Sequence, residues 1–194
     1  MTLLILASTS PRRAELLRQV GVDFVQRAVE IDETPHPGEV AAHTALRLAR
    51  SKAEAGCISG ANDHAILAAD TLVSFEGEAL GKPRDRDDGL AMLRRLSGRQ
   101  HQVYTAVALA CAGEVQAFLS VSHVSFRPLA ESEIIAYWNT GEPADKAGGY
   151  AIQGLAGTFI TRLEGSYSGV MGLPLFETAE LLRAAGVPLW RPLA

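Results

Sequence analysis

Apolar runs of strand length alternate with amphipathic segments of helical period along this chain, and the alternation limits the folds it can adopt. The strand-like segments are residues 3–7, 22–29, 65–75, 101–112 and 116–126, with weaker ones at 149–153 and 157–163. The helix-like segments are residues 11–20, 38–55, 86–96, 131–139 and 175–185. Such alternation favours an α/β domain with helices packed on a largely parallel sheet. A short turn at residues 112–115 predicts a hairpin, which makes the sheet mixed.

Composition excludes several classes of protein. The chain has 194 residues, 47% hydrophobic and 21% charged, so it is long enough for one sizeable core. A net charge of −4 argues against broad electrostatic binding to nucleic acid. Cys57 and Cys111 have no metal or redox spacing, which indicates a reducing compartment. We expect no signal peptide and no membrane-spanning segment, and we expect one domain over residues 1–194.

The segment from residue 3 to residue 13 joins a buried strand to a helix. Pro11 suits the first helical position, and Ser10 just before it is a good N-cap. Arg12 and Arg13 lie in the first turn, where cations oppose the helix dipole unless an anion is nearby. The exposed N–H groups of a helix start suit a phosphate. A plain strand–helix joint with two solvated arginines explains the segment equally well.

Two charged residues interrupt apolar patterns. Asp70 lies inside the apolar run 65–73, where a carboxylate is costly to bury unless it is paired or bound to a cation. We therefore favour a functional carboxylate over one that caps a turn. Lys52 continues the apolar stripe of the helix at 38–55, so it should point toward the sheet. A lysine that snorkels out at the helix end is the alternative.

The remaining chemistry-bearing residues are carboxylates and cations. Lys82 lies in the stiff turn 81–83, where a surface lysine is the default interpretation. An acidic cluster at Glu30, Asp32 and Glu33 could bind a divalent ion, although acidic loops are usually solvated. The histidines and cysteines show no zinc spacing, and there is no Walker A motif, dinucleotide fingerprint or nucleophile elbow. What remains suits metal-assisted chemistry on a phosphorylated substrate.

A collinear set of motifs covers nearly the whole chain. It comprises residues 8–13, 32–33, 47–53, 69–71, 81–83, 96–98, 140–143, 145–150, 152–154, 165–167 and 172–175. In these motifs the chain resembles the Maf family of nucleoside triphosphate pyrophosphatases. The resemblance implies a mixed twisted sheet with flanking helices and two lobes around a deep cleft, similar to the inosine triphosphate pyrophosphatase fold. It further implies a cytoplasmic house-cleaning enzyme that uses Mg, Mn or Co to release pyrophosphate from nucleoside triphosphates. Nucleic acid and membrane partners are not expected, and a homodimer is left open.

The resemblance also implies roles for individual residues. It makes Asp70 the proton acceptor, and Glu33, Lys52 and Lys82 essential polar groups around the phosphates. Glu33 and Asp70 are the expected metal ligands, although the sequence does not separate base from ligand for Asp70. The implied substrate-binding residues are Ser8, Ser10, Arg12, Arg13, Thr71 and Gln153.

Three of these residues resemble the dTTP/UTP pyrophosphatase branch of the family: Arg12, Thr71 and Gln153. The 7-methyl-GTP branch carries Trp, Gln and Glu at these places, and a cationic methylated guanine would stack on the tryptophan. The Gln153 amide can both donate and accept, as the edge of an uncharged pyrimidine requires. Two alternatives remain: a nucleotide-sensing regulatory protein that affects septum formation, and a purine pyrophosphatase acting on inosine or xanthosine triphosphate.

Overall fold

The computed structural model describes residues 3–57 and 64–190. Its strands are β1 (Leu3–Ala7), β2 (Val25–Arg27), β3 (His64–Phe75), β4 (Glu78–Leu80), β5 (Gln100–Cys111), β6 (Glu114–Phe126) and β7 (Ile160–Glu164). Its α-helices are α1 (Pro11–Gln19), α2 (Ala41–Ala55), α3 (Arg86–Leu96), α4 (Glu131–Asn139), α5 (Tyr167–Met171) and α6 (Leu175–Ala184). Three short 3-10 helices are η1 (Glu142–Asp145), η2 (Ala147–Gly149) and η3 (Leu155–Phe159). No helix in the described ranges has the length and apolarity that a membrane span needs.

The strands form one mixed sheet in the order β2-β1-β3-β5-β6-β7, with β4 beside β3. This confirms the predicted mixed sheet with flanking helices. The largely parallel arrangement that the alternation favours is wrong, because among the described strands β1 makes the parallel pairs and the other pairs are antiparallel. The predicted hairpin is confirmed: Ala112 and Gly113 have φ of 51° and 84°, as a two-residue turn between β5 and β6 requires.

The sequence patterns and the observed elements differ in a few places. The predicted strand at 149–153 is wrong: Gly148 and Gly149 have φ of 69°, a left-handed conformation that does not continue into a strand, and a turn follows. Residues 155–159 form η3 before β7 begins at Ile160. Helix α2 begins at Ala41 rather than at 38, because Gly38 has a φ of 75°. Strand β4, helix α5 and the 3-10 helices carry no pattern long enough to be predicted.

One edge of β3 is open at its centre. Strand β1 pairs with β3 as far as Leu6 opposite Leu67, and β4 pairs with β3 from Val73 opposite Leu80 onward. Residues 68–72 therefore have no strand beside them on that edge among the described strands, although β5 covers the other edge. Successive side chains of this stretch point to opposite faces of the sheet. A ligand at the gap can thus be reached from both faces.

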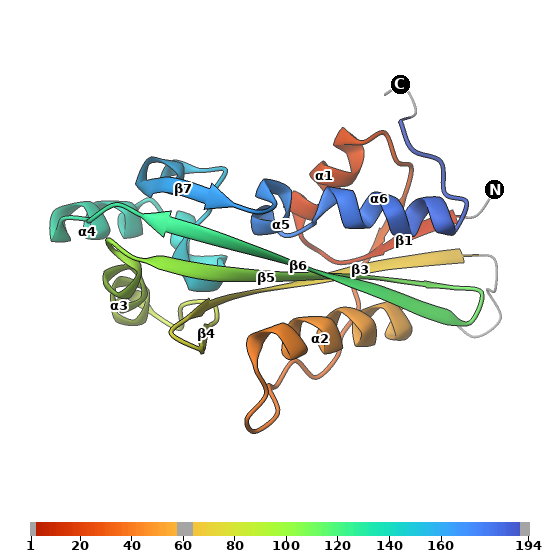
Figure 1. Ribbon diagram of the computed structural model, residues 1–194, viewed down its shortest axis with the longest axis horizontal. Helices are drawn as coiled ribbons and strands as arrows, with labels where there is room; N and C mark the ends of the chain where they lie inside the picture. Colours follow the sequence, from red (N-terminus) through yellow and green to blue (C-terminus); the bar gives the residue numbers. More distant parts are fainter. Residues whose placement is uncertain (1–2, 58–63, 191–194) are drawn as a thin grey trace.

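Helix α2 packs against one face of the sheet, and α1, α5 and α6 lie on the other (Figure 1). On the α2 face, alanines of the helix meet alanines of β3 and β5, and these small side chains let helix and sheet approach closely. The opposite face carries two separate apolar clusters. One packs beneath α1 and α6, and the other beneath α3 and α4 at the far end of the long strands (Figure 1). This division of the core agrees with the expected two lobes.

Candidate active site

A pocket of about 640 Å³ lies against the open edge of β3. Its walls come from the turn between β1 and α1, from α2, from β3, and from the loops at 81–82 and 145–153. The structure brings every predicted site residue to this pocket: Ser8, Ser10, Arg12, Arg13, Glu33, Lys52, Asp70, Thr71, Lys82 and Gln153. The pocket is therefore the candidate site for the chemistry that these residues can perform.

Asp70 and Lys52 form an ion pair in the wall of the pocket. The side chain of Lys52 points toward the sheet, as predicted, and the residue is only 9% exposed. Its Nζ donates a hydrogen bond of 2.7 Å to Oδ1 of Asp70, which is 7% exposed. Glu33 Oε1 lies 2.7 Å from the same Nζ, but the Glu33 side chain is 61% exposed. One lysine therefore bridges a buried carboxylate and a solvent-facing one.

The loop that carries Glu33 is tied to α2 by Arg47. The guanidinium of Arg47 donates to both carboxylate oxygens of Glu39, at 2.7 and 2.8 Å, and to the carbonyl of Thr34 at 3.1 Å. These hydrogen bonds lower the pKa of Glu39 to about 2. Asp32 accepts the backbone N–H of Thr34 and so tightens the same turn. The acidic cluster is therefore an ordered loop that presents Glu33 to Lys52.

Arg13 is held on the other face of the open edge. Its Nε donates to the carbonyl of Gly172 at 2.8 Å, and its Nη1 donates to Ser8 Oγ at 3.3 Å. Its Nη2 lies 3.4 Å from Thr71 Oγ1, which in turn lies 3.1 Å from Thr105 Oγ1. Burial lowers the pKa of Arg13, and the charge of Asp70 acts against that effect. Thr71, predicted to help select the base, thus makes its contacts with Arg13 and Thr105.

Three cations at the pocket have no acidic partner. Arg12, Arg13 and Lys82 make no ion pair with a residue of the described ranges. Ser10 takes the predicted N-cap position of α1, but its side chain does not cap the helix, and no acidic residue occupies the first turn. The first N–H groups of α1 therefore have no carboxylate or hydroxyl oxygen to satisfy them. Cations without an ion-pair partner in the described ranges, together with an uncapped helix start, favour a multiply charged anion.

The pocket also contains residues that sequence reasoning did not assign to the site. Asp145 and Lys146 line it and form an ion pair with each other. Their motif is recognisable in the sequence, but the pattern gives neither residue a role. Thr105 does not line the pocket but contacts Thr71, which does. It is 1% exposed and donates to the carbonyl of Gly169 at 2.7 Å. A threonine within an apolar strand was the available signal, and it becomes informative only when Thr71 is known to lie opposite it.

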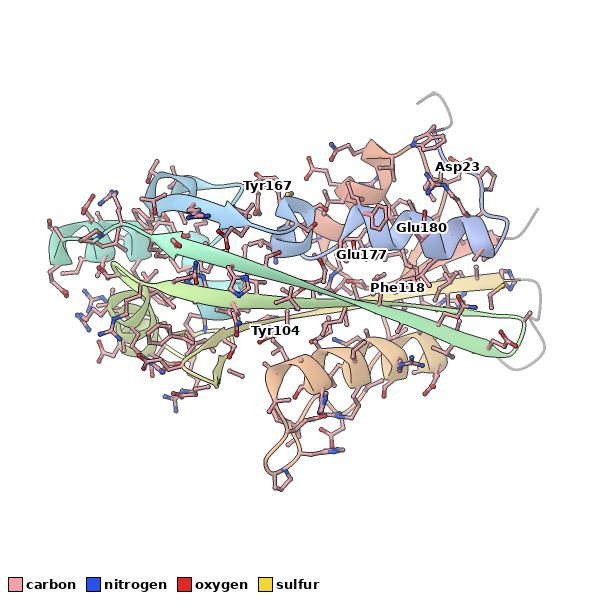
Figure 2. All side chains as sticks on the ribbon, viewed as in Figure 1. Asp23, Tyr104, Phe118, Tyr167, Glu177 and Glu180 are labelled. Atoms are coloured by element: carbon pink, nitrogen blue, oxygen red, sulfur yellow. The ribbon has the colours of Figure 1, made fainter. Side chains whose placement is uncertain are left out.

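Gln153 lines the pocket from the loop between η2 and η3. Its side chain is exposed and makes no hydrogen bond with the described residues. Figure 2 labels Tyr167, Glu177 and Glu180 on α5 and α6, which are different elements from the loop that carries Gln153. The amide of Gln153 is therefore available to a ligand.

The donor set at the pocket fits a hard divalent cation that also binds phosphate oxygens. No group of three acidic, histidine or cysteine side chains is arranged to hold a metal within residues 3–57 and 64–190. Glu33 and Asp70 each place one carboxylate oxygen 2.7 Å from Lys52 Nζ, so the two carboxylates lie near each other. Magnesium is commonly bound through one or two carboxylates together with substrate phosphates. Two neighbouring carboxylates beside an anion site match that requirement.

Comparison with known proteins gives consistent matches over nearly the whole chain. A family model described as "Maf-like protein" matches residues 3–185. A protein of Aromatoleum aromaticum named dTTP/UTP pyrophosphatase is 52% identical, covering 95% of this chain and 96% of its own. A protein of Methylobacillus flagellatus with the same name is 53% identical, covering 97% and 96% of the two chains. The family match spans every segment that lines the pocket.

Among solved structures, the Staphylococcus aureus Ham1 protein is similar with a TM-score of 0.48. The identity is 13%, and the match covers 93% of this chain and 96% of that one.

Proposed function

This chain belongs to the Maf family, and we propose that it hydrolyses dTTP and UTP to the nucleoside monophosphate and pyrophosphate in a metal-dependent reaction. The observation that carries the proposal is the buried pair of Asp70 and Lys52 at the open edge of β3, facing a pocket with three unpaired cations. The names of relatives about half identical to this chain support the choice of nucleotides. Such an activity would clear pyrimidine triphosphates from the nucleotide pool.

The triphosphate binds where the cations have no acidic partner. Arg12 and Arg13 approach it from the start of α1, and Lys82 approaches it from the loop between β4 and α3. A triphosphate brings about four negative charges, which these side chains and the helix start offset. Arg13 is the most constrained of them, because three of its nitrogens already contact protein oxygens. Its position is thus fixed before the substrate arrives, which lowers the cost of binding.

Asp70 acts as the proton acceptor for the attacking water. Its Oδ1 is occupied by Lys52, while Oδ2 makes no hydrogen bond with the described residues. Water attacks the α-phosphorus, its proton passes to the Asp70 carboxylate, and the bond from the α-phosphorus to the bridging oxygen breaks. Pyrophosphate leaves with that electron pair. Lys52 keeps Asp70 in place and, with Lys82, offsets the charge that builds on the phosphate oxygens.

A divalent cation would be held by Glu33 and Asp70 together with phosphate oxygens. When bound, it supplies charge neutralisation at the phosphates and polarises the phosphorus that is attacked. Gln153 accounts for base selection, because its amide can donate to a carbonyl and accept from the N–H of thymine or uracil. Arg12 disfavours a cationic base such as 7-methylguanine by repulsion.

The proposal is tested by incubating the purified protein with dTTP, UTP, 7-methyl-GTP and ITP, each with Mg, Mn or Co and with chelator. We expect pyrophosphate from dTTP and UTP at the highest kcat/KM, and none with chelator. The Asp70→Asn variant serves as the control for contaminating activity. Intact dTTP would favour a nucleotide-sensing binding protein, and a preference for ITP would favour a purine pyrophosphatase.

A further inference from the structure

The carboxylate of Glu142 anchors the loop that carries Gln153. Glu142 Oε2 accepts the backbone N–H of Leu155 at 3.0 Å, and Oε1 accepts the backbone N–H of Ala156 at 3.3 Å. Both amides lie at the start of η3, where helical N–H groups have no partner within the helix. Glu142 lies in η1, so it caps η3 from another element. The two backbone amides that it binds come two and three residues after Gln153.

Tyr137 extends this anchor to the other side of Gln153. Its hydroxyl donates to Glu142 Oε1 at 2.7 Å and accepts the backbone N–H of Ala151 at 3.2 Å. The residue is 4% exposed, and burial together with the Glu142 carboxylate raises the pKa of the phenol. The hydroxyl therefore stays protonated and donates a hydrogen bond to Glu142. Backbone groups before and after Gln153 are thus bound to one pair of side chains.

Gly154 shows how closely the carboxylate approaches the loop. A Cβ at this position would lie 2.2 Å from Glu142 Oε2, which is closer than any real contact. A glycine directly after Gln153 is therefore needed for Glu142 to reach the amides of Leu155 and Ala156. The need for glycine here is therefore one of packing.

Gln153 depends on this anchor for its position. Its own side chain makes no hydrogen bond with the described residues, and it faces the pocket with an exposed amide. Its backbone lies in a turn that the Gly154 N–H closes by donating to the carbonyl of Ala151 at 3.0 Å. Tyr137 and Glu142 hold the two sides of that turn through the backbone N–H groups of Ala151 and Leu155. A polar group that reads a base must be held within a fraction of an ångström, which requires support of this kind.

We propose that Glu142 is a positioning residue for base recognition, acting through the loop that carries Gln153. The inference rests on the proposed function and deepens it, because it assigns the selection of a pyrimidine to an anchor outside the pocket, the pair Glu142 and Tyr137. Glu142 and Tyr137 do not line the pocket, so they act on the substrate through Gln153.

The test uses the full chain and compares Glu142→Gln with Tyr137→Phe. An amide at 142 can accept one backbone N–H but presents a donor to the other, and phenylalanine at 137 releases Ala151. We expect KM for dTTP to rise about tenfold in Glu142→Gln, the size of one mispaired hydrogen bond. A smaller rise is expected in Tyr137→Phe, with kcat nearly unchanged in both variants. The preference for dTTP over 7-methyl-GTP should fall by the same factor.

Inorganic tripolyphosphate separates base recognition from phosphate binding, because it has no base. Its inhibition constant should be the same in the wild type and both variants. Glu133→Gln is the matched control: this carboxylate also accepts a backbone N–H and pairs with Arg127, but it lies away from the pocket. It should leave KM, kcat and the dTTP preference unchanged.

Two outcomes would overturn the inference alone: active variants with unchanged KM for dTTP, or tripolyphosphate inhibition weakened as much as dTTP binding. The second outcome would mean that the anchor formed by Glu142 and Tyr137 supports the whole pocket. If Glu142→Gln does not fold, the result with Tyr137→Phe decides. A wild type that leaves dTTP intact would overturn the proposed function first, and is distinguishable because no variant is involved.

Discussion

Lys52 Nζ lies 2.7 Å from Asp70 Oδ1, and both residues are more than nine-tenths buried. Such a pair stabilises a fold weakly, because desolvation of the two charges offsets most of their attraction. Asp70 lies in residues 68–72 of β3, which have no neighbouring strand on the pocket side among the described strands, and this position points instead to chemistry.

Asp70→Asn should remove turnover while the protein still folds. The amide keeps the shape of the side chain and can still accept from Lys52, which also retains Glu33 as a partner. Loss of a general base typically lowers kcat by about 10²–10⁴. Steady-state kinetics and a thermal melt of the variant check this. Near wild-type kcat at saturating metal would show that Asp70 is not the proton acceptor.

Lys82→Ala should lower activity without affecting stability. The residue is exposed, lines the pocket and has no ion-pair partner among the described residues, so the fold does not need its charge. We expect a loss on the order of 10²–10³ in kcat/KM if it offsets charge in the transition state. Arg84→Ala is a neighbouring control, because Arg84 is paired with Asp88. If the two variants have the same kcat/KM, Lys82 is a surface lysine with no role in the reaction.

Thr105→Val should weaken both the fold and the binding of the triphosphate. The Thr105 hydroxyl bonds to Gly169 and contacts Thr71, which supports Arg13. Its loss should reduce the free energy of unfolding by about 1–2 kcal/mol and raise KM. Thr178→Val is a matched control, since the buried Thr178 hydroxyl has no hydrogen-bond partner among residues 3–57 and 64–190. Chemical denaturation curves of the two variants should therefore differ, and identical curves would remove the proposed support of Arg13.

The buried His101 should make the fold sensitive to acid. Burial lowers the pKa of His101 to about 4 from 6.5, so the folded state resists a proton that the unfolded chain accepts. Stability from the neutral ring is present above pH 6.5 and is lost as pH falls toward 4. Between pH 7 and pH 5 the wild type should lose about 2 kcal/mol more than His101→Gln. Urea denaturation at both pH values checks this, and parallel losses in the two proteins would contradict it.

The sequence predicts those site residues whose placement follows from local periodicity. Lys52 continues an apolar stripe and Asp70 interrupts an apolar run, and both patterns led to the right placement. Relationships between distant segments were not accessible in this way. The gap beside β3 depends on where β1 stops and β4 starts, and the Thr71–Thr105 contact depends on the register of β3 with β5. The periodicity of a single segment gives neither where the neighbouring strands end nor how they are aligned.

The prediction of a strand at 149–153 was wrong for a different reason. Its apolar residues suggested a strand, but their burial comes from packing against α3, α4 and β3, and the preceding glycines turn the chain. Short apolar runs without a partner strand are ambiguous, since buried turns satisfy the same pattern. The hydrogen bonds that Glu142 and Tyr137 make to this loop take the place of strand pairing.

The most direct test of the central claim is the hydrolysis of dTTP in water enriched in ¹⁸O, with the products analysed by mass spectrometry. Attack of an Asp70-activated water on the α-phosphorus predicts dTMP that carries one ¹⁸O atom and pyrophosphate that carries none. Label in pyrophosphate would place the attack on the β-phosphorus, and dTDP with inorganic phosphate would place it on the γ-phosphorus. Either result would contradict the reaction proposed for this pocket.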